Sequence, residues 1–193
     1  MQGQLDTALD GRGRWQAERL ADALDGESID AIVSSDLMRA MCTAAPLAAR
    51  HGLRVRAEPA LRERSFGVFQ GFTYAHIAKH WPDEAVRWRA RDPQFGAVGG
   101  ETLVTFHRRV VEAAERLGSE FAGRSVVWVT HGGVLDCLHR AAMRVALDAA
   151  RSWALDNASF NRMLYTDQGL MLVGWGDVRH LDAQAQPLAT GES

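Results

Sequence analysis

Apolar and polar positions follow two different rhythms along the chain, and together they predict strands that alternate with helices. Short apolar runs bounded by turn residues are typical of buried strands. Two such runs occur at 29–35 and 125–131, and the segment 53–59 alternates between apolar and polar residues, which also predicts a strand. Segments with apolar residues every three or four positions predict helices at 11–24, 37–51, 102–122 and 132–143. Within the second helix, Pro46 is expected to bend or break the hydrogen-bond ladder.

The remaining segments complete this interpretation. Residues 61–72 are punctuated by glycine and predict a structured loop, whereas 72–100 contain two short amphipathic helices separated at Pro82 and are interpreted as a small lid. Turn residues between two apolar runs near the end of the chain predict a hairpin. We expect one α/β domain over 1–182, a small lid at about 72–100, and a loose tail over 183–193.

The alternation of strands and helices predicts a three-layer α/β sandwich with a mostly parallel central sheet. In such a sheet, ligands bind where the carboxyl ends of the strands meet. Composition agrees with a globular protein: of 193 residues, 47% are hydrophobic and 24% charged, with a formal net charge of -2. Neither a leader segment nor a run of about 18 apolar residues occurs. We therefore expect a cytoplasmic protein without nucleic-acid or membrane partners.

The corner after the third strand is the first candidate for chemistry. His131 follows the apolar run, and Gly132 and Gly133 allow the backbone to turn closely into the next helix. Backbone amides at the start of that helix point outward and favour an anion such as phosphate. A histidine that only caps the strand through one hydrogen bond is an equally good interpretation of this motif alone.

Two further positions extend the hypothesis. Arg39 opens the helix after the first predicted strand, and its planar guanidinium suits phosphate oxygens, although a solvated surface arginine is the commoner case. Glu63 lies between two arginines in the glycine-punctuated loop. It could be an exposed ion-pair partner, or a general acid if its pKa were raised beside a phosphate site.

Four blocks in order, SSDLMRAMCTA, LRERSFGVFQG, GGET and VTHGG, resemble the histidine phosphatase superfamily over nearly the whole chain. The resemblance implies a phosphoryl-transfer pocket with two histidines and two arginines, and it requires neither metal nor cofactor. Arg39 would bind phosphate, Glu63 would protonate the leaving oxygen, and His131 would stabilise charge on the transferring group. These roles are coherent because phosphoryl transfer depends mainly on positioning and cationic stabilisation.

The same resemblance implies weaker assignments and a class of substrate. Expected substrate contacts come from the polar turn at the start of the chain, the helix corner, the rim and the lid: Gln2, Gly3, Gly132, Asn157, Ser159 and Trp88. Trp88 has the alternative of simple packing. The partner would be a small phosphorylated metabolite, such as α-ribazole phosphate, a sugar phosphate or a range of phosphomonoesters, and a homodimer is one assembly that the resemblance allows.

One departure from the family pattern concerns the nucleophile. The family carries it in an Arg-His-Gly motif at the end of a first strand, whereas this sequence begins in the polar turn after that motif. Either Met1 is an internal methionine, or the sequence is a shortened form, or the protein lacks the strand and acts as a binding module. Deletion of a central strand would cost several kcal/mol or more, which favours the first two explanations.

The function predicted for the parent protein is therefore a metal-independent phosphomonoesterase that uses a phosphohistidine, and the chain as written is expected to be inactive. The short interval between Glu63 and Gly99 favours a phosphatase over a phosphoglycerate mutase-type isomerase. A nucleotide-binding domain is disfavoured because neither a GxGxxG nor a Walker sequence occurs. A catalytically dead module that binds phosphate ligands remains the other alternative.

Overall fold

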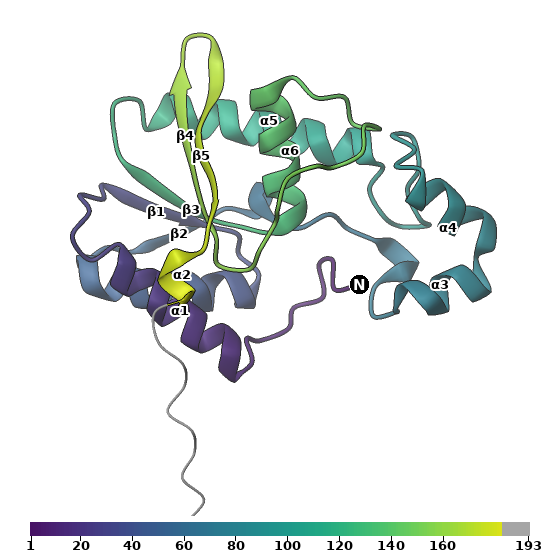
Figure 1. Ribbon diagram of the computed structural model, residues 1–193, viewed down its shortest axis with the longest axis horizontal. Helices are drawn as coiled ribbons and strands as arrows, with labels where there is room; N and C mark the ends of the chain where they lie inside the picture. The colour runs from purple at the N-terminus through teal and green to yellow at the C-terminus, as the bar shows by residue number, and fades with distance from the viewer. Residues whose placement is uncertain (183–193) are drawn as a thin grey trace, which may run out of the picture.

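The computed structural model describes residues 1–182, and the predicted loose tail at 183–193 lies outside them. Helices and strands alternate along the chain except between the second and third strands, where several helices follow one another, and a hairpin comes after the last long helix (Figure 1). The helices are α1 (Gly11–Ala23), α2 (Met38–His51), α3 (Tyr74–His80), α4 (Pro82–Arg89), α5 (Leu103–Glu120), α6 (Gly132–Met143) and α7 (Arg179–Asp182). The strands are β1 (Ala31–Ser34), β2 (Val55–Ala57), β3 (Val126–Val129), β4 (Phe160–Thr166) and β5 (Gly169–Asp177), and two 3-10 turns cover Pro59–Leu61 and Gly67–Phe69.

The central sheet is parallel, as the alternating pattern predicts, and its strand order is β2-β1-β3. Ile32 of β1 aligns with Val55 on one side and with Val127 on the other. The predicted hairpin is confirmed as a separate antiparallel pair, β4-β5. All three parallel strands therefore point their carboxyl ends at one edge, where Ser34 and Ser35 are followed by α2 and Val129 is followed by His131 and α6.

Helices cover both faces of the parallel sheet, which confirms the sandwich prediction (Figure 1). On one face, α1 and α2 bury Leu20, Leu24 and Leu47 against Ile32 and Val129. On the other, α5 and α6 form a second apolar cluster around the opposite face of β1: Val33, Leu61, Phe106, Val110, Leu117, Val134 and Leu138. The alternation of Ile32 and Val33 between the two clusters is the two-residue period of a strand buried on both faces.

The two short helices predicted around Pro82 are present as α3 and α4. Beneath them, Phe69, Trp88 and Phe95 form an aromatic cluster, with ring centroids of Trp88 and Phe95 6.4 Å apart. The segment is fastened to α6 by Arg91, which donates to Asp136 Oδ2 at 2.8 Å. The fully buried Arg140 donates to the same oxygen at 2.9 Å. Residues 72–100 thus have their own small core and one ionic tie to the main body.

Two local details differ from the sequence-based expectations. Pro46 lies inside a helix that continues to His51, because Ala44, Leu47 and Ala48 are buried around it. The run Val126–Val129 forms the predicted strand, but three of its four residues are only partly buried. Packing therefore keeps α2 helical despite the proline's preference against a helix interior. The side chains of β3 are apolar, but the described residues bury most of them only in part.

Candidate active site

His131 occupies the corner between β3 and α6 and caps the helix with extended backbone angles, φ -125° and ψ 161°. Its ring is buried, and Nε2 shares a hydrogen bond of 2.8 Å with Ser35 Oγ, at the end of the neighbouring strand. Burial lowers the pKa of His131 to about 3, and the charges of Arg39 and Arg109 act in the same direction. The imidazole is therefore neutral at physiological pH unless an anion binds beside it.

Glu63 reaches the same corner from the loop after Leu61. Its carboxylate accepts hydrogen bonds from the backbone N–H groups of Gly133, at 3.0 Å, and Arg64, at 2.7 Å. Burial raises the pKa of Glu63, and these two donors together with the charge of Arg39 only partly oppose it. A carboxyl with a raised pKa next to a helix N-terminus can hold a proton and release it to a reacting group.

Arg39, in the first turn of α2, lines the same cavity. Its guanidinium donates to the carbonyl oxygens of Leu5, at 2.8 Å, and Gly3, at 2.6 Å. It forms no salt bridge within residues 1–182, and its pKa is lowered, chiefly by burial. Arg39 therefore folds the first residues of the chain over the site and keeps a positive charge there.

Arg109 of α5 supports this site, although no motif in the sequence points to it. It donates to the carbonyl oxygens of Ala60, at 2.8 Å, and Arg62, at 3.0 Å. The Glu101 carboxylate, in the GGET block, pairs with the same guanidinium at 2.8 Å. Arg109 thus fixes the backbone that leads into Glu63. An arginine in an amphipathic helix has no distinctive sequence signal, and only the three-dimensional packing reveals its partners.

The predicted site residues meet at one cavity of about 1870 Å³. Eight of the nine line it: Gln2, Gly3, Arg39, Glu63, His131, Gly132, Asn157 and Ser159. Trp88 does not; its ring packs edge-on against Phe66 at 4.8 Å and lies under the Arg64 guanidinium. The structure therefore places Trp88 in the core of the 72–100 segment, in agreement with the packing alternative.

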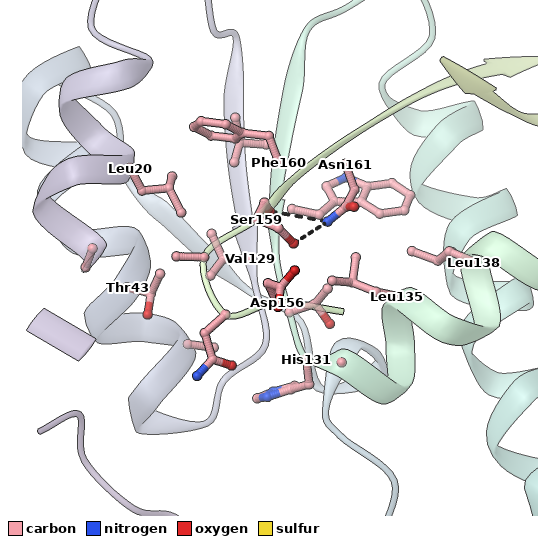
Figure 2. Close-up of a pocket in the computed structure, with 18 of the residues that line it drawn as sticks. Leu20, Thr43, Val129, His131, Leu135, Leu138, Asp156, Ser159, Phe160 and Asn161 are labelled. Carbon is pink, nitrogen blue, oxygen red and sulfur yellow. Dashed lines mark hydrogen bonds between the residues drawn. The ribbon is translucent and has the colours of Figure 1, made fainter. Parts of the chain in front are cut away.

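The cavity extends well beyond the predicted site residues. Figure 2 shows Leu20 on one wall and Leu135 and Leu138 on the opposite wall, with His131 at one end. Ser159 and Asn161 are joined there by a side-chain hydrogen bond of 3.1 Å. Among residues 1–182, no cluster of three or more His, Cys, Asp or Glu side chains is arranged to hold a metal ion.

Comparison with known proteins agrees with this geometry. The chain belongs to the histidine phosphatase superfamily, branch 1, whose family model matches residues 1–178. It is 36% identical to phosphoglycerate mutase-like protein 4 of Arabidopsis thaliana over 187 residues, 94% of this chain and 80% of the relative. It is 37% identical to glucosyl-3-phosphoglycerate phosphatase of Mycobacterium tuberculosis over 175 residues, 84% of this chain and 77% of the relative.

Solved structures show the same fold. The complex of mycobacterial glucosyl-3-phosphoglycerate phosphatase with inorganic phosphate superposes with a TM-score of 0.80 at 34% identity, covering 93% of this chain and 92% of that chain. YhfR of Bacillus stearothermophilus gives a TM-score of 0.86 at 26% identity, covering 94% and 90%. The relatives include both phosphatases and mutase-like proteins, and they support a phosphatase-type enzyme. No helix within residues 1–182 is long and apolar enough to span a membrane.

Proposed function

We propose that these 193 residues form all but the nucleophile-bearing segment of a metal-independent phosphomonoester hydrolase, which works through a phosphohistidine. The observation that carries the proposal is that Glu63, a carboxyl of raised pKa, lines the same cavity as His131 and the positively charged Arg39. A proton donor and a fixed cation are what a phosphate ester needs for its P–O bond to break.

Each residue takes a defined part in this proposal. Arg39 binds the phosphoryl oxygens, and His131 stabilises the charge that spreads over them in the transition state. Glu63 gives its proton to the departing alkoxide and afterwards takes one from the water that attacks the phosphohistidine. Gly132 contributes backbone at the helix start, and polar groups at the mouth orient the substrate: Gln2, Gly3, Asn157 and Ser159.

The nucleophile is proposed to be a histidine in a segment that precedes Met1. Besides His131, the chain contains His51, His76, His80, His107, His139 and His180, and none of these lines the cavity. In the first step the histidine nitrogen bonds to phosphorus while the P–O bond to the alkoxide breaks. In the second step water releases phosphate and restores the histidine. The 193 residues alone are therefore proposed to be inactive.

The proposed substrate is a small phosphorylated metabolite, and the protein is proposed to act in the cytoplasm as one domain, 1–182, with 72–100 as its lid. Names of relatives, which include glucosyl-3-phosphoglycerate phosphatase and phosphoserine phosphatase 1, favour hydrolysis of a metabolite that carries a carboxylate or sugar. A mutase-type isomerase is the second candidate, because the relatives also include phosphoglycerate mutase-like proteins.

The test compares the 193-residue chain with a form extended by the in-frame residues encoded upstream of Met1. The extended form should hydrolyse phosphoserine, glucosyl-3-phosphoglycerate or a general phosphomonoester, whereas the 193-residue chain should not. In the extended form, Glu63→Gln should lower kcat while the inhibition constant of phosphate stays nearly unchanged. Turnover by the purified 193-residue chain would contradict the proposal, and interconversion of phosphoglycerates without net hydrolysis would favour the mutase.

A further inference from the structure

Arg64 is a buried cation that the proposed mechanism does not use. Its side chain does not line the cavity, and only 9% of the residue is exposed. Within residues 1–182 it forms no salt bridge, whereas Arg62, two positions earlier, pairs with Asp36. Arginines are almost never fully buried unless a partner compensates their charge. The burial of Arg64 therefore calls for a physical reason other than an ion pair.

The guanidinium of Arg64 is held mainly by the 72–100 segment. Its Nη2 donates to the carbonyl oxygen of Phe95 at 2.6 Å, and its Nε donates to the carbonyl oxygen of Glu101 at 3.0 Å. Its Cζ lies 5.0 Å from the centre of the Trp88 ring, a distance at which an aromatic face attracts a cation. Burial lowers the pKa of Arg64 to about 10. The side chain is thus anchored by α4 and by the loop that follows this helix.

The main chain of the same residue holds the carboxyl of Glu63. The backbone N–H of Arg64 donates to Glu63 Oε1 at 2.7 Å, and the N–H of Gly133 donates to Oε2 at 3.0 Å. Each carboxylate oxygen therefore has a backbone donor, and the two donors together fix the direction in which the carboxyl faces the cavity. One of these donors belongs to a residue whose side chain is anchored in the 72–100 segment.

We propose that Arg64 is a positioning residue: the ring of Trp88 holds its guanidinium, and its backbone N–H in turn fixes the carboxyl of Glu63 at the cavity. This inference rests on the proposed function, in which Glu63 is the proton donor. Trp88 therefore acts on the site without lining the cavity. A misplacement of about 1 Å at a reacting group can lower a rate about a hundredfold, so this anchoring matters for turnover.

The test compares two tryptophans of the same aromatic cluster. Both rings pack against Phe69, with centroid distances of 5.4 Å for Trp81 and 6.2 Å for Trp88. Of the two, only Trp88 lies under the Arg64 guanidinium. Trp88→Leu and Trp81→Leu therefore make the same change in the same cluster, and only the first removes the ring that holds Arg64. If Arg64 served packing alone, both variants would lose stability and neither would alter Glu63.

NMR of the 193-residue protein with ¹³C-labelled glutamate side chains measures the effect on Glu63. The signal of this residue is identified by its absence in Glu63→Gln. In Trp88→Leu the amide of Arg64 should exchange about tenfold faster. The titration midpoint of Glu63 should move to higher pH, because a donor to the ionised carboxyl is weakened. In Trp81→Leu neither quantity should change.

The other charged and titratable groups that face Glu63 come from different elements. They are Arg39 of α2, Arg109 of α5, and His131 and Cys137 at the start and in the middle of α6. All of them are the same in both tryptophan variants, so a difference between these variants reports on Arg64.

A second variant keeps the inference testable if Trp88→Leu does not fold, which circular dichroism shows. Arg64→Lys retains the positive charge but lacks the planar fork that bonds Phe95 and Glu101 and stacks on the ring. It should show the same faster exchange at residue 64 and the same upward movement of the Glu63 midpoint. If it shows neither, charge alone is sufficient and the inference is wrong.

Failure of this inference differs from failure of the proposed function. Equal changes in the two tryptophan variants, or a folded Trp88→Leu in which the Glu63 midpoint does not move to higher pH, overturn the inference. In the form extended upstream of Met1, Trp88→Leu should lower kcat about tenfold or more with little change in KM. The alkaline limb of its rate profile should move to higher pH. If the NMR changes occur but the extended form hydrolyses no phosphate ester, only the phosphatase proposal fails.

Discussion

Adjacent glycines at the start of α6 allow a sharp test of how Glu63 is held. A Cβ atom on Gly133 would lie 2.1 Å from Glu63 Oε1, whereas a Cβ on Gly132 would meet no atom within 4 Å. In Gly133→Ala the carboxylate must therefore retreat by about 1 Å. That movement breaks the 3.0 Å hydrogen bond from Gly133 N to Glu63. Gly132→Ala is the matched control.

The magnitude follows from the difference between the two variants. Both replace glycine by alanine in the first turn of one helix, so the gain in helix propensity, up to about 1 kcal/mol, largely cancels. What remains is the hydrogen bond to a carboxylate, worth about 1.5–3 kcal/mol. Gly133→Ala should therefore be less stable than Gly132→Ala by about 1.5–3 kcal/mol. For a chain of this size, the difference corresponds to roughly 3–12 °C in Tm.

Urea unfolding of the 193-residue protein, followed by tryptophan fluorescence and circular dichroism, measures this difference directly. Equal m-values would show that both variants expose the same amount of surface on unfolding. If the unfolding midpoint of Gly133→Ala equals or exceeds that of Gly132→Ala, the amide of Gly133 does not fix Glu63. The description of Glu63 as a carboxyl held at the helix start would then be wrong.

Four further outcomes are expected. Because burial raises the pKa of Glu63, the folded state binds this proton more tightly than the unfolded state. The stability that this proton contributes is thus fully present below about pH 4.5 and is lost as pH rises through the pKa of Glu63 in the folded state. When the free energy of unfolding in urea is measured against pH, Glu63→Gln should remove this loss. An unchanged pH dependence would contradict the burial argument. NMR should show the His131 ring neutral down to about pH 4, consistent with a pKa of about 3, whereas a midpoint near 6.5 would mean that the ring is solvated. Asp136→Asn should lower the free energy of unfolding in urea by about 3–5 kcal/mol, because the fully buried Arg140 loses its counter-charge. Asp92→Asn, at an exposed ion pair with Arg87, should change it little. Equal effects of the two substitutions would contradict this ranking. Arg39→Ala should speed amide hydrogen exchange at residues 3–7, because the carbonyl oxygens of Gly3 and Leu5 lose their hydrogen bonds to the guanidinium. Arg54→Ala, at an exposed position, should not change it. Exchange that stays slow in Arg39→Ala would show that other contacts hold this segment.

Local sequence patterns were sufficient for much of the fold. Apolar periodicity predicted the parallel strands, the long helices and the hairpin, since each depends mainly on residues a few positions apart. Motif order also indicated the family, and the comparisons confirmed it. Pro46 was the limit of this approach: its local preference against helix is real, but burial of its neighbours against α1 and β1 outweighs it.

The site was only partly predictable. Strand ends could be expected to bring Arg39 and His131 together, because parallel strands share one carboxyl edge. The side-chain partners could not be expected: Arg109 reaches the Glu63 loop from 46 residues away along the chain, and Trp88 turns into an aromatic core instead of the cavity. Such contacts depend on the packing of distant elements, which periodicity does not encode.

The sequence by itself therefore determined the order and type of the elements, the parallel sheet, and the placing of Arg39 and His131 at the turns that follow two strands. These properties arise from local backbone preference and apolar spacing. Only the tertiary structure decided the protonation behaviour of Glu63 and His131, since burial and backbone donors from other elements set their pKa values. It alone also decided the strand order β2-β1-β3, because strand pairing joins residues that lie far apart in the chain.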